Sequence, residues 1–165
     1  MTEPATSALQ MAALAPLDVA PRLSRVRQRL GEQADALLVS DLSNLRWLTG
    51  FTGSNGWAVV APTELILVTD GRYGVQAAAQ MAELGVDGRV LVGGTSAELL
   101  EHLVASTANF STLAVEADHV SHSQFLQYQE SMKAQLVSTS GVVEAERRTK
   151  DAGEVARIAE ACRIA

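Results

Sequence analysis

Hydrophobic residues along this chain fall into short blocks, and their spacing changes from one block to the next. Leu23, Val26 and Leu30 recur at i, i+3 and i+7, which predicts a helix with one buried stripe. The run Ala36-Leu37-Leu38-Val39 has no polar position and predicts a strand that is buried on both faces. Helical and extended spacing therefore alternate from the start of the patterned region.

Glycine and proline separate these blocks. Three glycines within residues 50–56 predict a loop, because glycine is unfavourable inside helices and strands. Two β-rich runs, 57–61 and 64–69, flank Pro62-Thr63 and predict an antiparallel hairpin.

Two later helix starts have the spacing of a capping box, Thr95 with Glu98 and Ser121 with Gln124. The expected elements are helices over 22–30, 43–49, 72–84, 95–105 and 121–134, and strands over 35–40, 57–61, 64–69, 89–92, 112–116 and 136–138. Strands that alternate with helices predict an α/β fold. We expect a mixed, roughly six-stranded sheet flanked by helices on both faces.

The last part of the chain has a different pattern. Residues 143–150 are charged and poor in large apolar side chains, which predicts a linker. Asp151 and Glu154 then begin a helix with one apolar stripe. The stripe consists of Val155, Ile158, Ala159 and Cys162. No stop signal follows, so we expect the natural protein to continue; the alternative is that this helix packs back onto the domain. Cys162 is expected to be a buried small hydrophobe.

The charge balance argues against one class of partner. With 13 basic and 19 acidic residues the net charge is −6, whereas nucleic-acid binding requires clustered cations. The one basic cluster is Arg22, Arg25, Arg27 and Arg29, which we expect to form a solvated helix face.

The remaining bulk features concern membranes and compartment. No apolar run approaches the roughly 20 residues that span a bilayer, so no membrane partner is expected. Residues 1–20 contain no Lys or Arg and so lack the charged start of a signal peptide. The single cysteine excludes an internal disulfide and fits a reducing compartment. These features predict a cytoplasmic protein. Residues 1–21 are rich in Ala and Pro, which predicts a flexible tail.

Three sets of short motifs occur in order along the chain. They are 35–39 with Asn44–Ser54; Thr69–Tyr73 with Gln76-Ala77; and Glu116 and Asp118 with Val143-Glu144, Arg148–Asp151 and Glu154. In this order they resemble the N-terminal domain of the metallopeptidase family that includes Xaa-Pro aminopeptidases, prolidases and creatinase. The resemblance implies the creatinase N-terminal, ribonuclease-H-like layered fold. It also implies that the tail (1–21) is followed by a creatinase-type domain (22–142), and by a linker with the first helix of a missing catalytic domain (143–165).

In that family the catalytic domain holds two divalent metal ions through two Asp, one His and two Glu, and a metal-activated water attacks the peptide bond beside proline. The resemblance therefore implies that this chain alone is not an enzyme, with no catalytic residue, metal ligand or cofactor of its own. The two metal ions would belong to the missing domain. The complete protein would be a homodimer or higher homo-oligomer that acts on short proline-containing peptides.

The same resemblance implies that one loop reaches the substrate pocket of the neighbouring subunit. On this chain the loop residues are Phe51, Thr52, Gly53, Ser54 and Asn55. The alternative for this glycine-rich loop is a simple turn without a role in the pocket. Some prolidases carry a charged segment there, whereas this chain has Gly53-Ser54-Asn55-Gly56, which favours a broader Xaa-Pro aminopeptidase. Six further motif residues are expected to be structural: Asn44, Trp47, Gly50, Asp70, Arg72 and Tyr73. Among these, Asp70 is expected to cap the following helix, and Arg72 is expected to pair with Asp70 or with another acid.

Some residues allow two interpretations. Trp47 and Phe51, at i and i+4, are either core residues or anchors of a pocket or interface. His119 and His122 lie on either side of the helix start at Ser121, so no helix holds their spacing, and we expect solvated loop residues and not metal ligands.

Two other functions remain open at this point. The first is a stand-alone protein-interaction module of the same fold. The second is the N-terminal domain of a creatinase-like hydrolase, which cleaves C–N bonds in small molecules, because a fold does not fix a function.

Overall fold

A computed structural model of the chain describes residues 14–165. It divides into a larger unit, Val19–Arg147, and a smaller unit that joins the residues up to Asp18 with Arg148–Ala165. The expected flexible tail lies mostly outside the described residues. Val19 is only 2 % exposed, so packing in the larger unit begins before residue 22.

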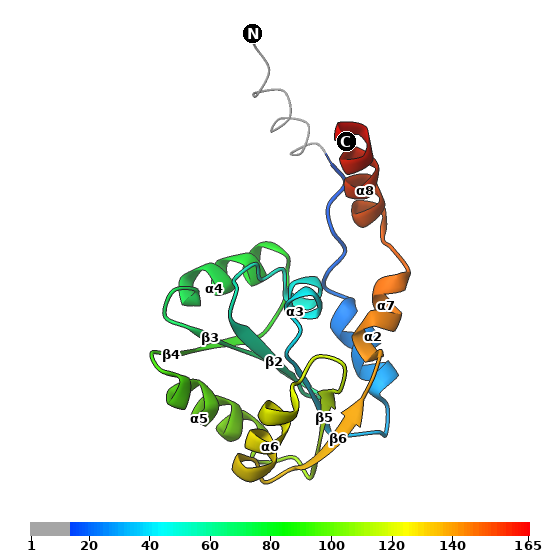
Figure 1. Cartoon of the computed structure of the whole chain (residues 1–165). Helices are drawn as coiled ribbons and strands as arrows, with labels where there is room; N and C mark the ends of the chain where they lie inside the picture. The colour runs from blue at the N-terminus through cyan, green and yellow to red at the C-terminus, as the bar shows by residue number, and fades with distance from the viewer. Residues whose placement is uncertain (1–13) are drawn as a thin grey trace. The chain divides into compact units, whose positions relative to one another are not determined.

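The larger unit is built on one mixed sheet (Figure 1). Its strands are β1 (Ala36–Val39), β2 (Gly56–Val60), β3 (Leu65–Asp70), β4 (Arg89–Gly93), β5 (Thr112–Glu116) and β6 (Gln135–Thr139). Within the described residues the strand order is β4-β3-β2-β1-β5-β6. Strand β2 pairs antiparallel with β1 and β3, while β1–β5, β3–β4 and β5–β6 are parallel. The predicted hairpin and the predicted mixed α/β sheet are confirmed.

Helices cover both faces of this sheet, with α4 on one side and α5 and α6 on the other (Figure 1). The helices of the larger unit are α2 (Arg22–Leu30), α3 (Leu42–Thr49), α4 (Gly74–Glu83), α5 (Ser96–Thr107), α6 (His122–Ser131) and α7 (Val142–Arg148). All four residues of β1 are buried, as its unbroken apolar run predicts. On the α5–α6 face, Leu103 and Tyr128 belong to the same buried cluster as the strand residues Leu38 and Val59.

The helix caps follow the predicted spacing with one exception. Ser121 and Gln124 form a complete capping box. At the start of α5 the Thr95 side chain accepts the Glu98 N–H, but Glu98 Oε2 accepts from the Gly94 N–H at 2.7 Å. In the box of Thr95 and Glu98, the Glu98 side chain therefore bonds the N–H one residue before the N-cap and not that of Thr95.

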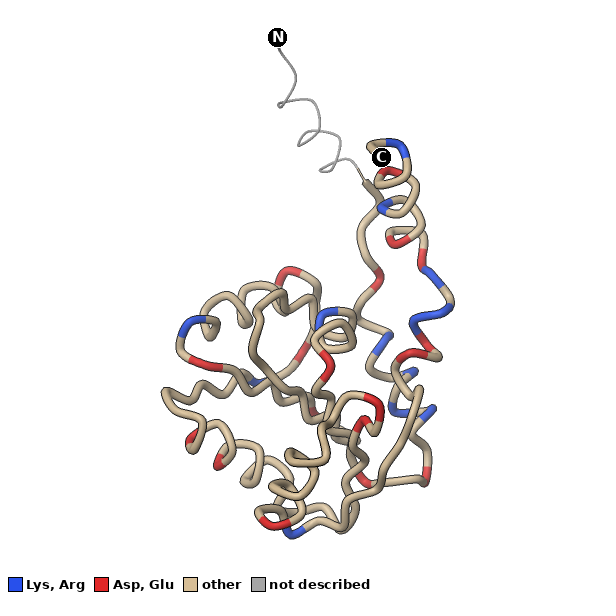
Figure 2. Tube along the Cα trace, viewed as in Figure 1, with Lys and Arg blue, Asp and Glu red and all other residues tan. Residues whose placement is uncertain are grey.

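The segment that we expected to be a linker is helical, because α7 spans Val142–Arg148. Val143 is 1 % exposed, and Glu146 Oε1 accepts from Arg29 Nε at 2.6 Å. Figure 2 shows the basic positions of α2 in blue beside the acidic positions of α7 in red. The local pattern predicted a linker because it contains only the charged side chains. The residues that pair with them lie more than 100 positions away along the chain.

The expectation of a solvated arginine face on α2 is wrong for Arg22. Arg22 is only 2 % exposed, and its Nη1 donates to the Trp47 carbonyl at 2.7 Å. The guanidinium also lies 4.6 Å from the centre of the Trp47 ring. Arg27 is used in the same way, since its Nε donates to the Ala61 carbonyl at 2.7 Å. These arginines bind α2 to the rest of the unit.

The smaller unit contains α8 (Ala152–Ile164), which begins with the predicted capping box of Asp151 and Glu154. Arg157 Nη1 donates to the Ala15 carbonyl at 2.7 Å. The apolar stripe of α8 is exposed, with Val155 at 53 % and Ile158 at 50 %. Cys162 is also exposed, which corrects the expectation that it is buried. No helix within residues 14–165 is long and apolar enough to cross a bilayer.

Candidate functional site

The strand register brings the loop after α3 next to the segment after β3. Gly56, the first residue of β2, is paired with Thr69 near the end of β3. Residues 51–55 therefore lie beside residues 70–73. We call the polar residues that meet there, Ser54, Asn55, Asp70, Arg72 and Tyr73, the loop cluster.

Hydrogen bonds hold the loop to the end of β3. The Ser54 and Tyr73 hydroxyl oxygens are 2.9 Å apart. Asn55 Nδ2 donates to Asp70 Oδ2 at 2.8 Å, and Thr69 Oγ1 donates to the Asn55 carbonyl at 2.6 Å. Both the side chain and the backbone of Asn55 are thus fixed.

Helix α4 braces the start of the same loop. Gln76 Nε2 and Gln80 Nε2 donate to Thr52 Oγ1 at 2.9 and 2.8 Å. The Thr52 N–H donates in turn to Gln80 Oε1 at 3.0 Å. Thr52 and Ser54 are nevertheless exposed, so the loop is braced from below and open above.

Of the two partners expected for Arg72, Asp70 or another acid, the structure shows Asp70. Arg72 Nε and Nη2 donate to the two carboxylate oxygens at 3.0 and 2.8 Å, a bidentate arrangement. These bonds, followed by that from Asn55, hold the pKa of Asp70 well below its usual range. The expectation that Asp70 caps the next helix is wrong: the N-cap of α4 is Tyr73, and Asp70 accepts the Arg72 N–H in the preceding turn.

Aromatic side chains form the base of the loop. Phe51 is 1 % exposed and meets Tyr73 edge to face, with ring centroids 5.8 Å apart. A Cβ on Gly53 would lie 2.9 Å from Tyr73 Cγ and would also overlap the Phe51 ring. Glycine is therefore required at 53 by close approach, and Phe51 is a core residue of this unit. The hydrogen bond with Ser54 lowers the pKa of Tyr73.

The other motif residues lie outside the loop cluster. Trp47 is 7 % exposed beneath Arg22, so the structure supports a core position for it. Gly50 ends α3 with φ of 76° in the left-handed region that favours glycine. Asn44 belongs to a second, buried group of polar residues.

We call this second group the Asn44 network, which consists of Asn44, Glu116, His119, Glu144 and Arg147. Asn44 is fully buried, and its Nδ2 donates to Glu116 Oε1 at 2.7 Å and also to Glu144 Oε1. Arg147 Nη1 donates to Asn44 Oδ1 at 2.7 Å. One amide therefore joins the end of β5, the first turn of α3 and helix α7.

Glu116 is the most buried acid of the network, at 7 % exposure. Its Oε2 accepts from the Ser40 N–H at 2.6 Å and the Asp41 N–H at 2.8 Å. These donors and the Asn44 amide satisfy a carboxylate that would otherwise be costly to bury.

His119 lies against carboxylates and is not a simple solvated loop residue. Nε2 is 3.1 Å from Glu144 Oε1, and Nδ1 is 3.5 Å from Asp41 Oδ2. Burial lowers the pKa of His119, but the bond with Glu144 and the nearby acids outweigh it and raise the pKa above its usual value. Burial raises the pKa of Glu144, whereas the bonds from Asn44 and His119 reverse this and lower the pKa overall.

In the sequence, Asn44, Glu116 and Glu144 are recognisable only as motif positions, and the motifs did not predict that these residues meet. One feature of the pattern could have indicated that Asp41 and Glu116 lie close together. Strands β1 and β5 are parallel neighbours, so their carboxyl ends meet at one edge of the sheet. Asp41 follows β1 and Glu116 ends β5. No pattern on α7 indicated that its acid and arginine would turn toward that edge.

Neither group has the arrangement of a catalytic centre. In the loop cluster the Asp70 carboxylate is neutralised by Arg72, whose side chain is 67 % exposed. Its remaining side chains do not pair a nucleophile with a base. Within residues 14–165, no three His, Cys, Asp or Glu side chains are grouped so that they could hold a metal ion. The loop cluster is instead suited to contact a ligand or a partner from a braced, exposed position.

The family comparison matches the larger unit. Residues 22–149 match the family model described as the Creatinase/Prolidase N-terminal domain. The Bacillus subtilis protein named uncharacterized peptidase YqhT is 29 % identical over 155 residues. That alignment covers 87 % of this chain and 40 % of the relative, so the chain spans well under half of that protein.

Solved structures resemble the chain in the same region. An Xaa-Pro dipeptidase from Bacillus anthracis has a TM-score of 0.75 at 23 % identity, over 81 % of this chain and 37 % of its own, which shows a shared fold. The N-terminal domain of the cytoplasmic peptidase PepQ from Mycobacterium tuberculosis has a TM-score of 0.65 at 29 % identity. It is matched over 76 % of this chain and 98 % of its own.

Proposed function

Because this chain belongs to the creatinase/prolidase N-terminal domain family, we propose that it is the non-catalytic N-terminal domain of an Xaa-Pro peptidase. The names of two similar proteins, an Xaa-Pro dipeptidase and a cytoplasmic peptidase, support this assignment. The complete protein would cleave short peptides beside proline as an aminopeptidase or dipeptidase.

The observation that carries the proposal is the braced loop at residues 51–55. Thr52 and Ser54 are exposed at its surface, while Gln80, Tyr73 and Asp70 fix it from below. Such a loop suits the wall of a substrate pocket, because side chains that are already ordered lose less entropy when they contact a ligand. We assign to this loop a contact with the substrate pocket of a neighbouring subunit in a homodimer or larger homo-oligomer.

The two divalent metal ions of such a peptidase do not fit the described part of this chain. Residues 14–165 hold no group of three or more potential His, Cys, Asp or Glu ligands. The relative from Bacillus subtilis is matched over only 40 % of its length, and we assign the metal ions, and the hydrolytic step, to the part of such a peptidase that lies beyond the matched domain. The present chain contributes positioning and contacts, and a cytoplasmic location is part of the same proposal.

The loop assignment can be tested in the product of the complete reading frame that contains this chain. Ser54→Trp enlarges the exposed tip of the loop. It should raise KM for Xaa-Pro peptides of four or more residues by about tenfold relative to tripeptides, with a smaller change in kcat. Gln129→Trp, at an exposed position on α6, is the matched control.

An unchanged ratio of KM values in Ser54→Trp would overturn the role of the loop. Cleavage of small-molecule C–N bonds without cleavage of Xaa-Pro peptides would instead favour the creatinase-like alternative. A reading frame without catalytic activity of either kind would favour the interaction module.

A further inference from the structure

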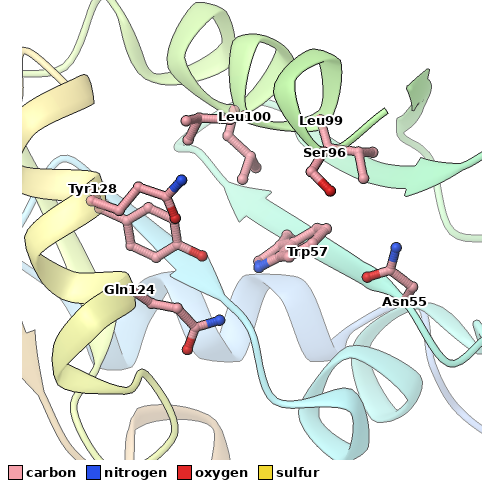
Figure 3. A pocket seen from close by; sticks show the side chains of 9 residues that line it. Asn55, Trp57, Ser96, Leu99, Leu100, Gln124 and Tyr128 are labelled. Carbon is pink, nitrogen blue, oxygen red and sulfur yellow. The ribbon is translucent and has the colours of Figure 1, made fainter. Parts of the chain in front are cut away.

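A separate pocket lies between helices α5 and α6 above strand β2 (Figure 3). Its volume is about 220 Å³. Ligand sites for drug-sized molecules usually measure about 300–1,000 Å³, so this pocket suits a smaller group. The pocket adjoins the loop cluster, because Asn55 lines the pocket and also donates to Asp70.

The inner wall of the pocket is apolar. Leu99 and Leu103 of α5 are 7 % and 2 % exposed, and Leu100 lies beside them. The indole ring of Trp57 lies opposite Leu99 and Leu100 in the pocket (Figure 3). A flat aromatic ring opposite branched aliphatic side chains favours an apolar side chain of matching thickness.

The remaining lining groups are polar and uncharged. Asn55, Gln124 and Gln127 contribute amides, which both donate and accept, and Ser96 contributes a hydroxyl. Asn55 uses its Nδ2 to donate to Asp70, and Gln124 uses its Oε1 to accept from the Ser121 N–H, so a ligand would meet the other amide atom of each. Burial raises the pKa of Tyr128, while a hydrogen bond from Trp57 partly opposes this, so the phenol stays neutral. Figure 3 shows the Tyr128 hydroxyl directed toward the Trp57 ring nitrogen.

None of the nine residues that line this pocket, all within the described part of the chain, carries a charge. A charged ligand group would lose its hydration here without gaining an opposite charge. Amide side chains that surround an apolar wall instead match a peptide bond, which has one donor and one acceptor next to an aliphatic side chain.

We infer that this pocket binds an uncharged peptide segment of one or two residues, with an aliphatic side chain inserted between Trp57 and the leucines of α5. The polar rim formed by Ser96, Gln124 and Gln127 pairs with its backbone amides. The inference does not require that the complete protein hydrolyse Xaa-Pro peptides, since binding is measured on this chain itself.

The test is titration of the isotope-labelled chain with N-acetyl-leucinamide, followed by NMR at the Trp57 indole N–H. We expect saturable shifts at Trp57 and at the Ser96 and Gln124 amides, with a Kd on the order of 1 mM, as befits a fragment-sized ligand. N-acetyl-glutamic acid α-amide, of similar size but charged, should bind at least about tenfold more weakly.

Ser96→Phe fills the mouth of the pocket from an exposed position at the start of α5 and should weaken binding at least about tenfold. Ala97→Phe, at the next exposed position, does not line the pocket and should leave binding within about twofold. Unfolding transitions of both variants verify that they fold.

Equal binding by the two variants, equal binding of the charged probe, or no shift at Trp57 would overturn the inference. Failure of peptide hydrolysis in the complete protein would not.

Discussion

Arg147 donates a hydrogen bond of 2.7 Å from Nη1 to Oδ1 of Asn44, a residue 103 positions earlier in the chain. Arg147 is the last residue of the larger unit, and Asn44 is fully buried in it. The charged end of α7 is thus tied to the same edge of the sheet that carries Glu116. This bond explains how a segment without a large apolar stripe remains helical and packed.

Removal of the Asn44 side chain should destabilise the larger unit. Asn44→Ala leaves Glu116 with one donor fewer in a site that is 7 % exposed, and also releases Glu144 and Arg147. We expect a loss of about 2–4 kcal/mol in the free energy of unfolding, measured by urea denaturation. Gln129→Ala, on the surface of α6, should change it by less than about 0.5 kcal/mol. A surface-like value for Asn44→Ala would show that the network does not stabilise the fold.

Stability should depend on pH through His119. Its folded pKa lies above the ordinary value of 6.5, so its protonated form stabilises the fold fully below that pH, and the contribution is lost as pH rises through the folded pKa. The pKa of Glu144 is lowered, so its contribution is present above pH 4.5 and is lost as pH falls through its folded value. The contributions of His119 and Glu144 to stability are therefore both present between about pH 4.5 and pH 6.5.

His119→Gln should therefore destabilise the protein more at about pH 5.5 than at about pH 8.5. The measurement is the free energy of unfolding of variant and parent at the two pH values. His122→Gln, an exposed residue at the start of α6, should not reproduce this difference. A pH-independent effect of His119→Gln would contradict the ion pairing of His119.

Buried and exposed arginines of α2 should differ in their contribution to stability. Arg22→Met removes the bond to the Trp47 carbonyl and the contact with its ring, which should cost about 2–3 kcal/mol in the free energy of unfolding. The side chain of Arg29 is 46 % exposed in its pair with Glu146, and Arg29→Met should cost at most about 1 kcal/mol. Equal costs in thermal or urea unfolding would show that Arg22 acts only as a surface charge.

Three glycines allow strain and crowding to be separated. Gly50 and Gly85 both have positive φ, 76° and 66°, but only at Gly50 would a Cβ overlap the Leu84 side chain. Gly85→Ala should cost about 1 kcal/mol from backbone strain, and Gly50→Ala about 2–3 kcal/mol. Gly71→Ala has neither penalty and should be close to neutral in urea unfolding. Equal costs at Gly50 and Gly85 would show that Leu84 moves aside freely.

Local patterns predicted the elements whose stabilising groups are close in sequence. The strand 36–39 is one unbroken apolar run, and the capping box of Ser121 and Gln124 lies within four residues. The order of these elements and the resemblance of their motifs were sufficient for the α/β fold and the family.

Features that depend on distant residues could not be predicted in this way. Helix α7 is held by Arg29 and Asn44, each more than 100 positions away. Cys162 was expected to be buried because its stripe is apolar, but no periodicity states what covers a stripe. The loop residues were identified by resemblance, whereas their bracing by Gln76, Gln80 and Tyr73 follows only from the register of β2 and β3.

The role proposed for this chain is to support a peptidase whose catalytic centre lies in another domain. The most direct measurement compares Xaa-Pro peptide hydrolysis by the product of the complete reading frame with that by the purified 165-residue chain, both supplied with divalent metal ions. We expect hydrolysis by the complete protein and none by the chain alone. Hydrolysis by the isolated chain, or a complete protein that leaves Xaa-Pro peptides intact, would contradict it.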